Sequence, residues 1–166
     1  MFFKTLLRTF FSDRDDVRTL LRRLESYFSL RSESEIELLA TALLADTTRF
    51  ATTRGNGAMP TGAADLADGV RRFLAQFDSI EMVGGTLHYS LAEVASSRVL
   101  EGGVTLGTAT DGAEIVALPH REEVFVVDGT EEAERVLEDR HKTIWHFVIW
   151  QAVTSNPPLL DELELR

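Results

Sequence analysis

The 166-residue chain contains no cysteine, and this absence excludes several classes of site. Without thiols the protein has no disulfide framework, no cysteine nucleophile and no cysteine-ligated zinc or iron–sulfur centre. A chain of this length favours a single domain whose core is large enough to fold without disulfides or metal clamps. The lack of cysteine is consistent with an intracellular protein, and we expect a cytoplasmic location.

Long apolar runs are also missing. No segment approaches about 18 uninterrupted apolar residues, so we expect no transmembrane segment. The N-terminal apolar pairs are interrupted by Lys4 and Arg8, unlike the continuous apolar region of a secretory signal. Residues 2–11 instead favour a short amphipathic helix. We expect its apolar stripe to dock on this chain or on a second copy, giving a homodimer through the N-terminal helices. A membrane surface is the weaker alternative, because only two positive charges support it.

Positive charge is scarce beyond the N-terminal part of the chain. Residues 1–31 hold seven Lys/Arg and four Asp/Glu, a net +3, whereas residues 32–166 hold ten and twenty-three, a net −13, which together give −10. An acidic body repels nucleic-acid phosphates, so we expect no direct nucleic-acid binding. Such a body attracts a basic protein partner, or simply keeps the protein in solution.

Phosphate-binding motifs are absent as well. The glycines at Gly102, Gly103 and Gly112 are not followed by the GK[ST] ending of a phosphate loop, and they lack the GxGxxG spacing of a dinucleotide site. Tight hairpin turns explain them better. We therefore expect no bound cofactor.

The chain has four histidines, the residues from which a general base would be drawn at neutral pH. None of them lies in a catalytic motif. His141 and His146 are five positions apart, which is poor spacing for joint metal binding on one helical face. His146 is expected to be a hydrogen-bonded core or groove residue. We therefore predict no catalytic residue and no metal site; an enzyme built around His88 or His120 is the alternative.

Two acidic pairs stand out, Glu122-Glu123 and Glu131-Glu132. Adjacent carboxylates diverge on a strand and lie about 100° apart on a helix, so neither pair converges on one substrate atom. They form either a solvated face or the rim of a site for a basic protein, which requires summed potential rather than convergence. The partner-binding residues predicted on this basis are Glu122, Glu123, Asp128, Glu131 and Glu132.

Apolar periodicity predicts a helical extension over residues 1–31, with Ser12 or Asp13 capping its second helix. The main domain then covers residues 32–166, and its first helix begins near Ser32 or Ser34. Residues 46–64 are rich in Thr, Gly and Ala and show no sustained period. This segment predicts a long loop, either an inserted segment or a binding element.

Residues 66–94 change from helical to strand periodicity. Apolar residues recur at helical spacing up to Phe77, and a strand-like tract follows from Met82, broken by Gly84-Gly85. Three further strands are predicted in a meander, at 104–108, 113–118 and 123–127. A helix capped by Thr130 follows, and the apolar residues 142–153 predict a final buried helix that ends before Pro157-Pro158. The order favours an α+β fold: a mostly antiparallel sheet of about four to six strands with helices packed on one face, preceded by the N-terminal helical extension.

This pattern resembles the SMI1/KNR4-like family, the SUKH superfamily. Leu66, the pair Phe73-Leu74 and the tract from Gly84 to Val94, which contains Gly84-Gly85, Ser90-Leu91 and Glu93-Val94, match its helix and following strand. Residues 107–117 resemble its glycine, Asp-Gly turn and hydrophobic strand, and residues 123–128 resemble its strand before the last helix. The similarity covers roughly residues 33–153 and brings no catalytic motif.

The resemblance implies a non-enzymatic protein that binds a partner. Many bacterial members of the family look like immunity proteins, antitoxins that neutralise polymorphic toxins, often nucleases. A nuclease presents a basic cleft to its substrate, so an acidic surface on this chain suits such a partner. The alternative function is an intracellular regulatory or scaffold module of the SMI1/KNR4 type.

Overall fold

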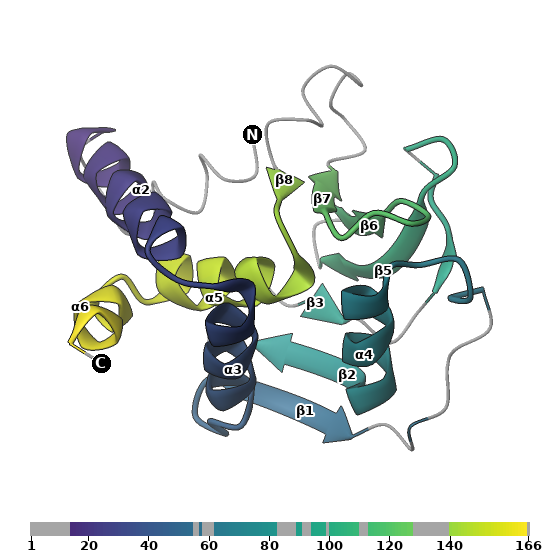
Figure 1. Ribbon diagram of the computed structural model, residues 1–166, viewed down its shortest axis with the longest axis horizontal. Helices are drawn as coiled ribbons and strands as arrows, with labels where there is room; N and C mark the ends of the chain where they lie inside the picture. The colour runs from purple at the N-terminus through teal and green to yellow at the C-terminus, as the bar shows by residue number, and fades with distance from the viewer. Residues whose placement is uncertain are drawn as a thin grey trace.

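The computed structural model describes residues 14–54, 57, 62–82, 89–90, 94–98, 100–109, 113–127 and 140–165. Over these residues the chain has the expected α+β fold, with helices α2 to α6 and two antiparallel sheets (Figure 1). The helices expected over residues 2–11 and from Thr130, the caps at Ser12 and Asp13, and the Gly84-Gly85 break lie outside the described residues.

Helices α2 (Arg14–Ser29) and α3 (Glu33–Leu44) open the described chain. Ser32 caps α3 as expected. Its hydroxyl accepts a hydrogen bond from the backbone N–H of Glu35 at 3.2 Å, and the Glu35 carboxylate accepts one from the Ser32 N–H at 2.9 Å. This reciprocal capping box satisfies two amide hydrogens, one at the cap residue and one in the first turn.

Helix α2 belongs to the same hydrophobic core as the rest of the fold. Leu20 and Leu24 are buried in the main cluster of apolar side chains. At its outer side, Arg23 forms ion pairs with Asp161 at 2.6 Å and Glu164 at 2.8 Å, both on the last helix. Helix α2 therefore contributes to the core and is joined at its outer side to the last helix.

Helix α4 (Asp68–Gln76) passes into strand β2 (Phe77–Met82) with no turn between them. The prediction that Phe77 continues the helix is wrong, since its backbone is extended, with φ −132° and ψ 125°. Its side chain nevertheless stays buried, 5.4 Å from the ring of Phe73. An apolar side chain at position 77 reaches the core from a helical or from an extended backbone. Helical periodicity therefore did not reveal that the chain changes from helix to strand at this residue.

Strand β2 pairs antiparallel with β1 (Phe50–Arg54) in a separate two-stranded sheet. The expectation of a loop over residues 46–64 is wrong for these five residues. Phe50 is buried and pairs with Met82. The Ser79 hydroxyl donates a hydrogen bond to the Thr53 hydroxyl at 2.9 Å. Strand pairing and one buried aromatic residue thus order a segment with little apolar pattern of its own.

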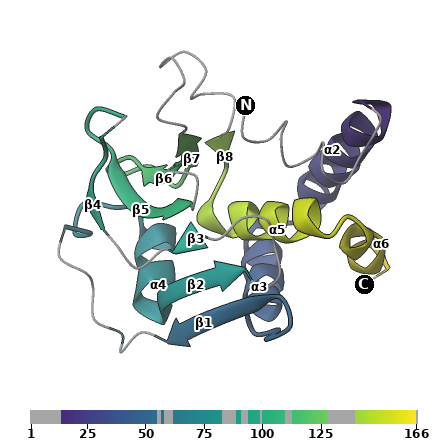
Figure 2. The same ribbon diagram turned by 180° about the vertical axis from the view of Figure 1, so that it is seen from behind.

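The larger sheet contains the predicted meander, and its order is β3-β5-β6-β7-β8, with β4 also paired to β5 (Figure 2). Its strands are β3 (Tyr89–Ser90), β4 (Ala95–Ser96), β5 (Val104–Ala109), β6 (Glu114–Ala117), β7 (Val124–Val127) and β8 (Arg140–His141). The three predicted strands of the meander are confirmed as β5, β6 and β7.

Strands β6 and β7 are buried on both faces, which explains why their sequences do not alternate. Ile115 and Val126 belong to the main core cluster. Val116 and Phe125, which are partners across the two strands, belong to a second cluster on the other face that also includes Val127. The sheet is therefore apolar on both sides at its centre.

The predicted final helix is confirmed as α5 (Ile144–Ser155). Figures 1 and 2 both show it crossing the middle of the molecule, from β8 towards α2 and α6. Helix α6 (Pro158–Glu164) was not predicted; it begins at Pro158, a residue type favoured in the first turn of a helix. No described helix combines the length and apolar composition needed to cross a membrane.

Candidate functional site

Two of the five predicted partner-binding residues, Glu122 and Glu123, lie beside the N-terminus of α4. The backbone N–H of Gly69 donates a hydrogen bond to the Glu122 carboxylate at 3.1 Å. Ala67, at the cap position, has no side-chain oxygen to offer. Glu122 therefore supplies the cap from a distant loop, and its negative charge also suits the positive end of the helix. Asp128, Glu131 and Glu132 lie outside the described residues.

The absence of a side chain at position 69 makes this contact available. A Cβ built on Gly69 would lie 2.3 Å from a Glu122 carboxylate oxygen. The same loop is tied down a second time, because the backbone N–H of His120 donates to the carbonyl of Asp65 at 2.9 Å. The loop and the start of α4 therefore form one unit.

This unit gathers acidic residues that the sequence keeps far apart, and we call them the α4 acidic surface: Asp65, Asp68, Glu122 and Glu123. The first three are exposed and Glu123 is half-buried. Arg71 pairs with Asp68, and Arg121 lies 3.9 Å from Glu123. Four carboxylates against these two arginines leave a net −2, so the surface remains acidic after its own ion pairs are counted.

Replacing Glu122 with alanine should lower the free energy of unfolding by about 1 kcal/mol, the usual cost of a lost helix cap. Urea unfolding measures this loss. Glu123→Ala is the matched control and should change stability by less than about 0.5 kcal/mol, as surface substitutions away from caps and core contacts generally do. Equal stabilities of the two variants would show that Glu122 does not act as the cap.

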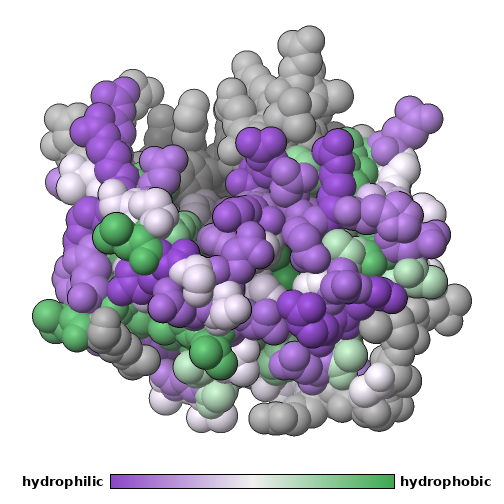
Figure 3. All heavy atoms as spheres, in the orientation of Figure 1, coloured by the Kyte–Doolittle hydropathy of each residue, from purple (hydrophilic) through white to green (hydrophobic). Residues whose placement is uncertain are grey.

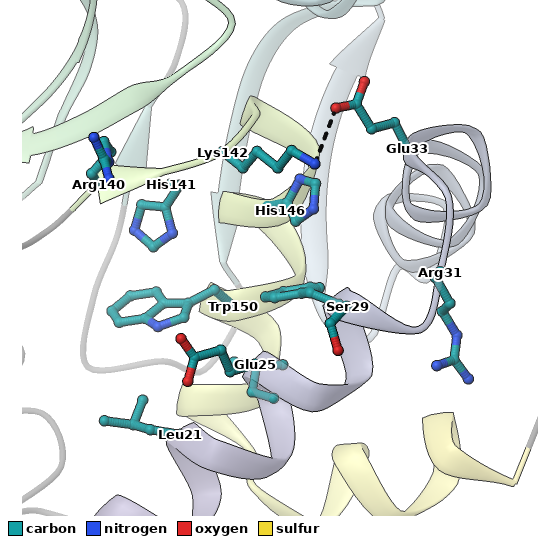
Figure 4. Close-up of a pocket in the computed structure, with 12 residues that line it drawn as sticks. Leu21, Glu25, Ser29, Arg31, Glu33, Arg140, His141, Lys142, His146 and Trp150 are labelled. Atoms are coloured by element: carbon teal, nitrogen blue, oxygen red, sulfur yellow. Dashed lines mark ion pairs between the residues drawn. The ribbon is translucent and has the colours of Figure 1, made fainter.

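A groove of about 690 Å³ lies between α2, β8 and α5 (Figure 4). Its apolar lining comes from Leu21, Leu24 and Phe28 of α2 and from Trp150 of α5. His141 of β8 and His146 of α5 also line it, as do the charged residues Glu25, Arg31, Glu33, Arg140 and Lys142. The groove falls within the size range of sites for small organic molecules.

Aromatic side chains meet edge to face inside the groove. The Phe28 and His146 rings are 4.8 Å apart, and the His141 and Trp150 rings are 4.9 Å apart. His141 also meets Phe147 at 5.3 Å. These contacts connect α2, β8 and α5 and give the groove stiff walls.

His146 is held in place by Thr143, the residue that caps α5. The Thr143 hydroxyl accepts from the backbone N–H of His146 at 3.2 Å and lies 2.7 Å from its Nδ1. When the Thr143 hydroxyl donates its proton to Nδ1, that nitrogen is the acceptor, so the neutral imidazole carries its own proton on Nε2. Burial, and then the positive charge of Lys142, lower the pKa of His146 from 6.5 to about 4, and Glu33 opposes the shift.

His141 is only 9% exposed. Burial, and then the neighbouring His146, hold its pKa down at about 3. Its ring packs edge to face against Phe147 and Trp150. Both groove histidines are therefore neutral near pH 7, and the prediction that His146 is a groove residue is confirmed.

Charged residues surround the groove mouth. Lys142 pairs with Glu33 at 3.3 Å, and the Arg31 guanidinium lies 3.5 Å from the centre of the Tyr27 ring. Arg140 is exposed and forms no ion pair with a described residue. The three cations and two carboxylates that line the groove sum to +1, in contrast to the −10 of the whole chain.

Of the other two histidines, only His120 lies in the described part of the chain, and it does not join this site. His120 is exposed on a turn with φ 62°, and it does not line the groove. His88 lies outside the described residues. In the part of the chain that the structure describes, no three His, Asp or Glu side chains gather as metal ligands would.

The sequence did not predict the groove. Its lining comes from α2 on one side and from β8 and α5 on the other, which follow α2 by more than one hundred residues, so no local spacing marks it. Comparison with models of protein families, with curated proteins and with solved structures found no match to this chain.

Proposed function

We propose that this chain is a non-enzymatic, partner-binding protein of the SUKH type, an immunity protein that neutralises a toxin in the cytoplasm by direct binding. The observation that carries the proposal is the α4 acidic surface, where separate segments bring Asp65, Asp68, Glu122 and Glu123 together. A summed negative potential of this kind speeds the approach of a basic partner. A toxin nuclease has such a basic surface, because its own substrate is an anion.

The surroundings of this surface support the same proposal. Figure 3 shows mainly hydrophilic residues over the centre of the face on which α4 lies. Carboxylates elsewhere are in surplus too: Asp78 and Glu81 on β2 are exposed and form no ion pair with a described residue. Occupying the toxin's basic cleft would inhibit it without any chemistry on this chain.

The proposal is tested by producing the chain together with the toxin encoded beside it. Cells should survive, and the purified complex should weaken as salt concentration rises. The double variant Asp65→Asn/Glu123→Gln should slow association at low salt by about tenfold. We avoid Glu122 here, since its loss would also remove the helix cap.

The matched control is Asp78→Asn/Glu81→Gln, which removes the same charge from β2. Its association rate should stay within about twofold of the original chain, because only the general field changes. Failure to protect against any neighbouring toxin would reject the immunity function and favour the regulatory or scaffold module. Equal slowing by both double variants would reject the α4 acidic surface as the contact.

A further inference from the structure

The groove between α2, β8 and α5 has the properties of a small-molecule site, and we infer that it binds a flat aromatic carboxylate. This inference is independent of the proposed protein partner, because the α4 acidic surface contributes no residue to the groove. It depends on two features: the aromatic walls and the excess of positive charge at one end.

The walls suit a flat aromatic ring. Phe28 and Trp150 line the groove and are only partly buried, and both belong to edge-to-face pairs with a histidine. A planar guest stacks against such faces with little loss of conformational entropy on the protein side, because packing already fixes the rings. The volume of about 690 Å³ holds a two-ring aromatic with room for bound water.

The charges at the groove ends decide the chemistry of the guest. Figure 4 shows Arg140 and Lys142 at the β8 end and Glu25 with Leu21 at the other. Lys142 already pairs with Glu33, whereas Arg140 has no described carboxylate partner. A guanidinium binds a planar carboxylate through two parallel hydrogen bonds, so an anionic group is expected at the β8 end.

His141 borders the same space. It lines the groove and meets Trp150 edge to face at 4.9 Å. A guest seated on Trp150 therefore lies next to this ring, while its carboxylate reaches Arg140, the residue before His141.

The test uses the full chain, labelled with ¹⁵N, and 2-naphthoate as the probe. The protein has two tryptophans, so two indole N–H signals are expected. Trp150 lines the groove, whereas Trp145 is 2% exposed and packs on Phe73 at 5.0 Å. The Trp150 signal, identified with Trp150→Phe, should shift and saturate at about millimolar probe, the affinity expected for a ligand of this size. The Trp145 signal should stay in place.

Two comparisons distinguish binding at this site from non-specific binding of the probe. The neutral isostere 2-naphthamide should bind about fivefold more weakly than 2-naphthoate, and Arg140→Gln should weaken naphthoate binding by a similar factor of about five. Arg98→Gln, an exposed arginine outside the groove, is the matched control and should bind normally. The inference is overturned if Trp150 does not shift, if the amide binds as well as the acid, or if Arg98→Gln weakens binding as much as Arg140→Gln.

Discussion

Lowering the pH from 7 to 5 should reduce the free energy of unfolding by about 2–4 kcal/mol, through the two groove histidines. Their pKa values are about 3 for His141 and about 4 for His146 in the folded protein, against 6.5 for an exposed histidine. Below pH 6.5 these two histidines therefore bind protons in the unfolded chain, whereas in the folded chain they remain neutral. Each histidine contributes up to about 1.4 kcal/mol per pH unit until its folded pKa is reached, and stability falls as the pH falls.

Urea unfolding at half-unit steps between pH 7.5 and 5 measures this slope, in a range above the usual titration of carboxylates. The charged groups around the histidines are Lys142, Glu33, Arg140 and Glu25. His141→Phe should lower the slope by about half. Val148→Ala removes core volume without removing a titrating group, so it should shift the curve down and leave the slope unchanged. A free energy that does not vary with pH would contradict the burial of neutral histidines.

Phe73→Ala should lower the free energy of unfolding by about 3–5 kcal/mol, a large part of the roughly 5–15 kcal/mol typical of a domain. Phe73 has no exposed surface and lies where α4, β2 and α5 meet. Its ring is 5.0 Å from Trp145 and 5.4 Å from Phe77. Alanine would leave a cavity bounded by elements that are each fixed elsewhere, so the gap does not close.

Tryptophan fluorescence during urea unfolding reports this loss directly, because Trp145 contacts the mutated side chain. Phe73→Leu keeps most of the volume and should cost less than about 1.5 kcal/mol. Leu38→Ala, at a site 72% exposed, should stay within about 0.5 kcal/mol of the original chain. A loss below about 1 kcal/mol for Phe73→Ala would show that the three elements do not share one packed centre.

Local chemistry made several elements predictable. The Ser32 to Glu35 spacing is a capping box, and its contacts depend only on four consecutive residues. The meander was predictable because a turn signal lies between β5 and β6 and because β-prone residues fill its strands. The last long helix was identified by its length and apolar content, and α5 confirms it.

The features that the sequence did not predict depend on tertiary contacts between segments that are distant in the chain. Strand β1 has one buried aromatic residue and owes its order to pairing with β2. Pro158 was interpreted only as the end of a helix, although proline is equally suited to begin one, as it does in α6. Glu122 is exposed, as predicted for a surface carboxylate, but its additional role as a cap was missed because it depends on a glycine 53 residues away.

The same two residues of β8 that line the groove have a consequence for aggregation. Strand β7 reads VFVV, a short, uncharged, β-prone segment of the kind that adds to sheets of other molecules. One side of it is paired with β6 along its whole length, and on the other side Arg140 and His141 cover Phe125 and Val124. Strand β8 places an exposed arginine at this position, a device by which proteins discourage edge-to-edge association. Opening of β8 alone would therefore present a ready template to a neighbouring chain, long before the core itself unfolds.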